Sequence, residues 1–249
     1  MKLIKRIAVP YSITIIVVCL VWKVLAVLVS QNVLPYPEDA IYTFLAALMT
    51  SEFWHHFAAS TFRAVMAMII GWGVAFPIGI LMGSSRRVDK FLSPFVSMTY
   101  PIPKVVLLPV VLLLFGLGDL SKIIIISLIL GYQVLVATRD GVRAIQPQHL
   151  DSIRSLGAGK WQLFWKGYFP AALPHGFTAL RLNSGVSVAV LFFVESFATS
   201  KGLGYLIMDA WGQMDFNTMF VGIFGMSLLG VILNEGSNFL EKISCPWKE

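Results

Sequence analysis

Six stretches of the chain consist almost entirely of apolar residues, and each is long enough for one membrane-spanning helix. A helix that crosses the hydrocarbon core of a bilayer needs about 20 such residues. The sequence therefore predicts an all-α, polytopic membrane protein with about six transmembrane helices. We expect a single domain over residues 1–249, with residues 58–240 as its core. The stretches cover about residues 7–30, 58–83, 94–116, 120–138, 174–198 and 216–240.

Prolines and glycines mark where the spans depart from plain apolar helices. Pro101 and Pro103 interrupt the third stretch, because each removes a backbone donor. Irregular backbone inside a membrane is tolerated only where protein or a water-filled cavity satisfies it. These prolines are therefore candidates either for lining a transport pathway or for a buried structural kink. In the second stretch, Gly79 and Gly83 form a Gly-x3-Gly pattern that predicts close helix packing.

Positively charged residues gather in alternate loops. Both chain ends and the loops around positions 86–90 and 139–166 are rich in lysine and arginine, whereas the opposite loops hold Glu38, Asp39, Asp209 and Asp215. Cytoplasmic loops carry such an excess of positive charge, so we expect both termini in the cytoplasm. The apolar run over residues 7–30 exceeds the roughly 7–15 residues of a signal peptide, and we expect it to be a retained first span.

Composition supports a lipid bilayer as the surrounding medium. Hydrophobic residues make up 57% and charged residues 13% of the 249 residues, compared with about 45–50% and about 25% in soluble domains. The formal net charge is +6. Basic cytoplasmic loops explain this charge, so we infer no nucleic-acid partner.

The sequence lacks the motifs that would make the chain an enzyme. It contains no Gly-x4-Gly-Lys-Ser/Thr loop for ATP phosphates and no Gly-x-Ser-x-Gly elbow. The histidines at positions 55, 56, 149 and 175 form no His-x3-His pair for a metal. We therefore expect a non-catalytic protein that binds no cofactor. A self-sufficient secondary transporter is the alternative, although such proteins show internal repeats and paired interrupted helices.

The longest hydrophilic segment, residues 139–173, has the pattern of a helix, a turn and a second helix. Pro147 suits a first helical position, and Gly157 suits the left-handed residue that ends a helix. Pro170 is expected to stop the second helix before the next span. Apolar or small residues recur at spacings of three or four along one face: Leu150, Ile153, Gly157, Trp161, Phe164 and Tyr168.

Two roles are open for this segment. A basic, tryptophan-bearing helix pair could rest on the lipid headgroups. Alternatively, part of the loop could insert as a helix into a groove on another protein. Periodicity alone does not decide between them.

The spacing of key residues in the segment resembles the loop signature of membrane subunits of ABC-type importers. That signature reads Glu-Ala-Ala, three residues, Gly, nine residues, Ile-x-Leu-Pro. Asp151 stands at the Glu position, Gly157 at the Gly and Pro170 at the Pro. Ser152 and Ile153 replace the two alanines, and the residues at 167 and 169 also differ from the signature.

The resemblance covers nearly the whole chain. Pro101-Ile-Pro103, Ala171-Ala-Leu-Pro174 and Gly202-Leu-Gly-Tyr-Leu-Ile207 all resemble segments of the same family. The most similar branch contains the nitrate, sulfonate, taurine and bicarbonate importers, and it includes carriers of vitamin precursors.

This resemblance implies a type I importer permease fold and a set of partners. Two permease copies, expected as a homodimer, would form the pathway in the plasma (inner) membrane of a bacterium or archaeon. Two cytoplasmic ABC ATPase subunits would bind the loop and use ATP and Mg²⁺. An extracytoplasmic substrate-binding protein would deliver a small solute, either a nitrate-, sulfonate- or taurine-like anion or a vitamin precursor. The implied coupling residues are Asp151, Ser152, Ile153, Arg154, Gly157, Ala158, Gly159 and Pro170.

Three ionisable residues lie within or near the ends of spans. Glu195 is costly there unless it faces a cavity or a partner. It is therefore a candidate either for the transport pathway or for a structural hydrogen bond. Arg63 and Arg181 lie near span ends, and we expect their side chains to extend to the membrane interface.

Overall fold

Helices make up all the regular structure in the part of the chain that the computed structural model describes, residues 2–29, 34–197 and 199–248. The longest are α1 (Lys2–Val29), α3 (Ser51–Ser84), α6 (Asp119–Arg143) and α12 (Phe216–Ser244). The shorter elements are α2 (Pro37–Ala47), α4 (Arg86–Thr99), the 3₁₀ helix η1 (Lys104–Leu107), α5 (Leu108–Phe115), α7 (Pro147–Ser155), α8 (Lys160–Leu163), the π-helix η2 (Phe164–Tyr168), α9 (Phe169–Leu182), α10 (Ser184–Glu195), α11 (Leu203–Gly212) and the 3₁₀ helix η3 (Pro246–Lys248).

Three of these helices, α3, α6 and α12, are each long and apolar enough to cross a membrane. Two pairs meet the same test only as bent units. One is α4 with Lys104–Phe115, bent by 82°, and the other is Lys160–Leu182 with α10, bent by 45°. α1 adds a 28-residue helix, of which Thr14–Val29 is apolar. The all-α polytopic fold is thus confirmed, while positions 30 and 198, the predicted ends of two spans, lie outside the described residues.

The third span differs from its predicted bounds. The chain leaves α4 after Thr99 and becomes helical again at Lys104, so the irregularity expected at Pro101 and Pro103 is confirmed. The Nζ of Lys104 donates to the backbone oxygens of Thr99 and Tyr100, at 2.9 and 2.7 Å, which satisfies carbonyls at the break. The helix itself begins at Arg86, before the predicted start of the span at residue 94, because a polar first half of α4 is helical too.

The helical run after α7 does not stop at Pro170. The structure continues from Lys160 through η2 and α9 to Leu182. In η2 the N–H of Phe169 bonds to the oxygen of Phe164, five residues back, and Pro170 falls in the first turn of α9. Proline is tolerated in a first turn. The expectation that Pro170 separates two helices is therefore wrong.

Glycines bring α3 and α6 into close contact at the centre of the core. A Cβ at Gly71 would stand 2.8 Å from the backbone oxygen of Ser127, and one at Gly79 would stand 2.8 Å from that of Leu135. At Gly83 a Cβ would meet the side chain of Val142. The packing role predicted for Gly79 and Gly83 is thus confirmed, and it makes α3 and α6 one rigid unit.

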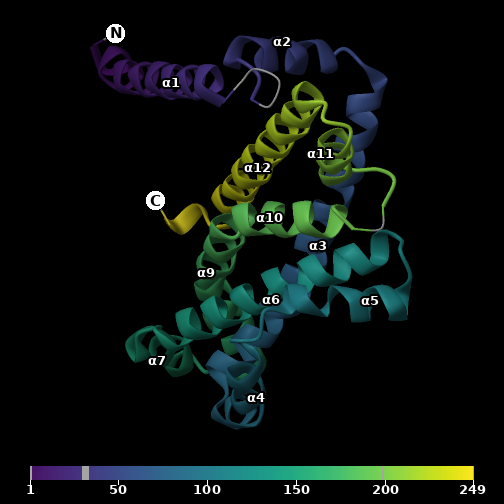
Figure 1. The fold of residues 1–249 in the computed structure, drawn as a ribbon. Coiled ribbons are helices and arrows are strands. Elements are labelled where there is room, and N and C mark those ends of the chain that lie inside the picture. The colour runs from purple at the N-terminus through teal and green to yellow at the C-terminus, as the bar shows by residue number, and fades with distance from the viewer. Residues whose placement is uncertain (1, 30–33, 198, 249) are drawn as a thin grey trace.

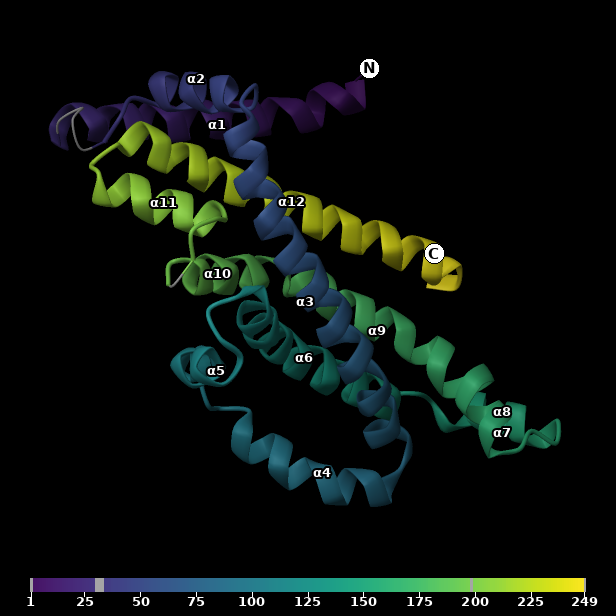
Figure 2. The same ribbon diagram turned by 90° about the vertical axis from the view of Figure 1, so that its right-hand side faces the viewer.

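Two views show which ends of the helices share a side of the molecule (Figures 1 and 2). The first turn of α1, the last turn of α12 and α7 lie on the same side, at the left in Figure 1 and at the right in Figure 2. α5 and α11 lie on the opposite side in both views. The arrangement separates two faces, one with α7 and one with α11.

Candidate functional site

The segment between α6 and α9 contains an exposed knob, residues 147–159, at the end of α6 and on the same side of the molecule as the end of α12 (Figure 2). Its helix α7 begins at Pro147 and ends at Ser155. Gly157 follows with φ +81°, a left-handed conformation that glycine adopts readily. A Cβ at Gly157 would have no heavy atom within 4 Å. Glycine is therefore required here by the backbone turn and not by packing.

The polar residues among the predicted coupling residues lie on the exposed face of α7. Asp151 and Arg154 form an ion pair of 2.8 Å, and Ser152 Oγ donates to a backbone oxygen one turn earlier, at 2.8 Å. Ile153 packs toward η2, where a Cβ at Gly167 would stand 3.4 Å from its Cδ1. The residue at 167 that departs from the loop signature thus leaves room for α7 to pack on η2.

The remaining candidates divide between the knob and the helix behind it. The N–H of Gly159 donates to Oε1 of Gln162 at 2.9 Å, which caps α8. Ala158 is half-buried between the two glycines. Pro170 lies away from the knob, inside the helical run to Leu182. The knob thus contains all the predicted coupling residues except Pro170.

Large apolar side chains cover the surface of the knob and of α8. Leu156 is 87% exposed and Trp161 is 73% exposed. Such side chains on a helical projection can contact either a groove on a second protein or the lipid headgroups.

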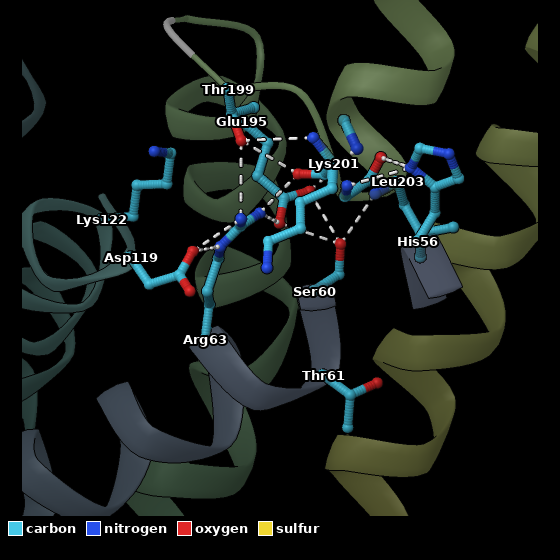
Figure 3. A network of polar contacts seen from close by, with 12 residues as sticks. His56, Ser60, Thr61, Arg63, Asp119, Lys122, Glu195, Thr199, Lys201 and Leu203 are labelled. Atoms are coloured by element: carbon cyan, nitrogen blue, oxygen red, sulfur yellow. Dashed lines mark hydrogen bonds and ion pairs between the residues drawn. The ribbon is translucent and has the colours of Figure 1, made fainter. Parts of the chain in front are cut away.

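A second cluster of polar residues is buried between α3, α6, α10 and α11 (Figure 3). Arg63 is its centre and is 1% exposed. Its guanidinium forms ion pairs with Asp119 at 2.7 Å and with Glu195 at 2.6 Å. Its Nη1 also donates to the backbone oxygen of Lys201 at 2.9 Å. One arginine therefore joins the first turn of α6 to the last turn of α10 and to the loop that follows.

Glu195 is equally buried and fully hydrogen-bonded. Its carboxylate accepts from Ser60 Oγ, at 2.8 and 2.9 Å, and from the N–H of Gly204 at 2.9 Å, besides Arg63. Ser60 Oγ in turn accepts from the N–H of Leu203 at 2.8 Å. These bonds hold the start of α11 against α3. Whether Glu195 also acts in the pathway stays a prediction.

The glycine at position 202 lets the backbone approach this ion pair closely. Gly202 has φ +126°, and a Cβ there would stand 2.6 Å from Nη1 of Arg63. Nδ1 of His56 lies 3.1 Å from both the backbone nitrogen and the oxygen of Gly202. A polar pocket of about 470 Å³ lies beside the cluster, lined in part by Arg63, Asp119 and Lys201. Glu195 does not line it.

The expectation that Arg63 extends to the membrane interface is wrong, because two carboxylates and a backbone oxygen satisfy it inside the core. Arg181 is 35% exposed in its side chain and lies 3.7 Å from Glu241 of α12. In the described ranges, no group of three His, Cys, Asp or Glu side chains could hold a metal ion. The cluster is an ionic and hydrogen-bonded junction.

Comparison with known proteins decides the family. Residues 75–242 match the family described as binding-protein-dependent transport system inner membrane component. The chain belongs to this family. As such a permease it is the membrane subunit of an ABC transport system, and the secondary-transporter alternative is excluded.

Several permeases are similar over most of this one. The putative aliphatic sulfonates transport permease protein SsuC of Bacillus subtilis is 31% identical over 234 residues, 93% of this chain and 85% of that protein. The taurine transport system permease protein TauC of Escherichia coli is 30% identical over 241 residues, 94% of this chain and 88% of that one. The formylaminopyrimidine transport permease protein ThiX of Halalkalibacterium halodurans is 27% identical over 230 residues, 92% of each.

A solved structure supports the permease fold. A chain of the MetNI methionine ABC transporter, in an inward facing conformation, superposes with a TM-score of 0.63. It is 14% identical in sequence and covers 79% of this permease and 99% of that chain. The type I importer permease fold expected from the sequence is therefore confirmed.

His56, Ser60 and Asp119 are members of the buried junction that were not predicted from the sequence. A signal for two of them was present, because His56, Ser60 and Arg63 are spaced by four and three residues in a largely apolar span. Such spacing places side chains on one face of a helix. A polar stripe on a membrane-spanning helix indicates a buried polar partner.

Proposed function

We propose that this permease forms, with a second copy of itself, the translocation pathway of a type I importer driven by cytoplasmic ATPase subunits. The observation that carries the proposal is the knob at residues 147–159. It presents an exposed helix end and Leu156 on the face that also holds the last turn of α12. The lysines and arginines of the loops favour the cytoplasm for this face, so both termini are cytoplasmic in this proposal.

In this proposal the permease provides the pathway, and its partners provide ATP hydrolysis and substrate delivery. ATP and Mg²⁺ are bound by the partner ATPases, and their closure moves the knob. The movement reorients the spans, so that the pathway opens alternately to either side. An extracytoplasmic binding protein delivers the solute at the opposite face, where α2 and α11 lie.

For the substrate, we propose a small sulfonate-type anion such as taurine or an alkanesulfonate. The names of two relatives that cover over nine-tenths of this chain support this class. A vitamin precursor is the second candidate, supported by the formylaminopyrimidine permease.

The test is reconstitution with the ATPase and the binding protein encoded by neighbouring genes. We expect the ATPase to co-purify with the permease and its hydrolysis to rise with loaded binding protein. Uptake of labelled taurine, an alkanesulfonate and formylaminopyrimidine into vesicles identifies the substrate class. An ATPase that never co-purifies with the parental permease contradicts the proposal.

Leu156→Asp distinguishes docking on the ATPase from resting on headgroups. Leu156 is 87% exposed, so its replacement leaves the fold intact. If the knob docks on the ATPase, co-purification is lost. Trp247→Asp is the matched control, because Trp247 is an exposed apolar residue on the same face but outside the knob. Loss of co-purification in both variants, or in neither, contradicts the assignment of the knob.

A further inference from the structure

The first half of α4 is attached to the end of α6 by a set of charged and polar side chains, which we call the α4 clamp: Asp89, Ser93, Arg139 and Arg143. Nε of Arg139 donates to Oδ1 of Asp89 at 2.6 Å, and its Nη2 donates to Ser93 Oγ at 3.0 Å. Arg143 forms an ion pair with the other oxygen of Asp89. Asp89 is buried. One carboxylate thus holds two arginines of the last turns of α6.

Between the clamp and the far end of α4, the two helices are separated by a pocket. It has a volume of about 430 Å³, and its walls are apolar side chains of α3, α4 and α6, including Ile78, Phe95 and Ile124. Van der Waals contact falls off steeply across such a gap. The middle of α4 is therefore poorly placed to follow a displacement of α6 by packing.

At the far end, polar contacts hold the break in the third span to α6. Thr99 Oγ1 lies 2.7 Å from the hydroxyl of Tyr132, and Nζ of Lys104 lies 4.2 Å from the centre of the Tyr132 ring. The break at Pro101 and Pro103 lies between these two residues. α4 is therefore attached to α6 at both of its ends, by the clamp at one end and by the contacts with Tyr132 at the other.

The two arginines of the clamp lie close to the knob along the chain. Only residues 144–146 separate the end of α6 from the start of α7. The end of α6 is also tightly packed. A Cβ at Gly141 would overlap His175 of α9, and one at Gly83 of α3 would stand 2.8 Å from the oxygen of Arg139. A displacement of the knob therefore reaches the arginines of the clamp through closely packed backbone.

We infer that Asp89 is a positioning residue for transport, which carries the displacement of the knob to α4 and so to the break at Pro101 and Pro103. This inference rests on the proposed function, because it needs an ATPase that moves the knob. Without the Asp89 carboxylate, α4 would keep only its chain link to α3 and the contacts with Tyr132, and it would follow α6 less closely. ATP would then be hydrolysed with a smaller rearrangement of the third span.

The experiment measures the movement of α4 directly in the reconstituted complex. Spin labels are placed at Met98 of α4 and Ile232 of α12, both exposed, after replacement of Cys19 and Cys245. The distance between the labels is measured by pulsed electron paramagnetic resonance, with and without trapping by ATP and vanadate. Hydrolysis of ATP is measured in the same samples.

In the parental complex we expect trapping to shift the distance. In Asp89→Asn we expect the ratio of shifted to unshifted complexes to fall by at least about fivefold, the lower end of typical allosteric coupling, while hydrolysis stays within about twofold. Asp89→Glu keeps a carboxylate for both Arg139 and Arg143, so it should retain the shift. Glu38→Gln is the control, because Glu38 forms an interhelical ion pair with Lys23 away from the clamp, and it should leave the shift unchanged.

Several results would overturn the inference. One is a parental complex in which α4 does not move on trapping, and another is a normal shift in Asp89→Asn. A parallel loss of shift and hydrolysis in both Asp89→Asn and Asp89→Glu would assign Asp89 a structural role only. If the ATPase does not co-purify with the parental permease, the proposed function itself fails. This outcome is seen before any variant is made.

Discussion

Arg63 binds three partners, one from α6, one from α10 and one from the loop after α10. Its removal would leave buried charge unpaired. Replacing a whole buried ion pair by apolar residues is often neutral, whereas removal of one partner costs about 3–5 kcal/mol. Glu195 has no measurable exposure of its side chain. Without Arg63 its carboxylate keeps only the bonds from Ser60 and Gly204, so its charge is left without its closest cation.

We expect Arg63→Met to destabilise the permease by about 3–5 kcal/mol. Arg63→Met combined with Glu195→Gln should recover part of this loss, because the neutral amide still accepts hydrogen bonds from Ser60 and Gly204. The measurement is thermal unfolding of the purified protein in detergent. Lys23→Met, in an exposed ion pair, is the control and should cause no measurable change. Equal unfolding temperatures for Arg63→Met and the parent would contradict the role of the junction.

Gly202→Ala should be more damaging than its size suggests. Its φ of +126° is unfavourable for any side chain, and a Cβ would stand 2.6 Å from Arg63 and Glu195. We expect low recovery of folded protein from the membrane. Gly212→Ala is the matched control, since a Cβ at Gly212 has open space around it. Similar recovery of both variants would show that the backbone at Gly202 can move away from the ion pair.

Single residues were predictable where their role is local. Gly157 and Pro147 could be assigned from helix-end chemistry alone, and both occupy the expected positions. The partners of Arg63 were not predictable in the same way, because Asp119, Glu195 and the oxygen of Lys201 come from distant parts of the chain. These partners come together only when the helices pack in one relative rotation. The pattern of residues within a single helix does not predict that rotation.

At the level of elements, the turn of the knob offers a direct comparison of two glycines. Gly157 has φ +81°, whereas Gly159 has φ −70°, and neither has a heavy atom near the position of its Cβ. Gly157→Val should therefore strain only the turn, at a cost of about 1–2 kcal/mol. Gly159→Val should be tolerated.

We expect Gly157→Val to lower uptake and stimulated ATP hydrolysis in the reconstituted complex while the spans stay folded. The strain is comparable to typical coupling free energies of about 1–3 kcal/mol, so it shifts the docked position of the knob. The readouts are hydrolysis with and without loaded binding protein, uptake, and recovery of the ATPase. Indistinguishable activities of the two valine variants would remove Gly157 from the coupling mechanism.

The existence of the apolar spans could be predicted from length and hydrophobicity, but their bends and bounds could not. α4 begins at Arg86 because its polar residues pair with Arg139 and Arg143, a contact between separate helices. The run from Lys160 passes Pro170 because η2 adapts the backbone there. α2 was also missed, although Pro37 and the acidic Glu38 and Asp39 in its first turn are a helix-start signal.

For the whole molecule, the two faces seen in Figures 1 and 2 give a topology that labelling can test. After replacement of Cys19 and Cys245, a single cysteine at Glu38 should react with a membrane-impermeant maleimide on intact cells. A cysteine at Ser152, exposed on the knob, should react only after the membrane is permeabilised. The reverse pattern would invert the orientation and place the knob out of reach of a cytoplasmic ATPase.

The loose attachment of α1 determines when it can take its final place during synthesis. Its described side-chain contacts with other helices include the stacking of Trp22 on Phe220 of α12, at 4.9 Å between ring centroids, and the ion pair of Lys23 with Glu38. Proteins are made from the N-terminus, and early segments insert before later ones exist. α1 must therefore insert into the bilayer because of its own hydrophobicity. It can pack on its aromatic partners only after α12 has been synthesised. α1 is synthesised before α12 and packs on it only afterwards, which makes the completed α1–α12 contact a marker of late assembly.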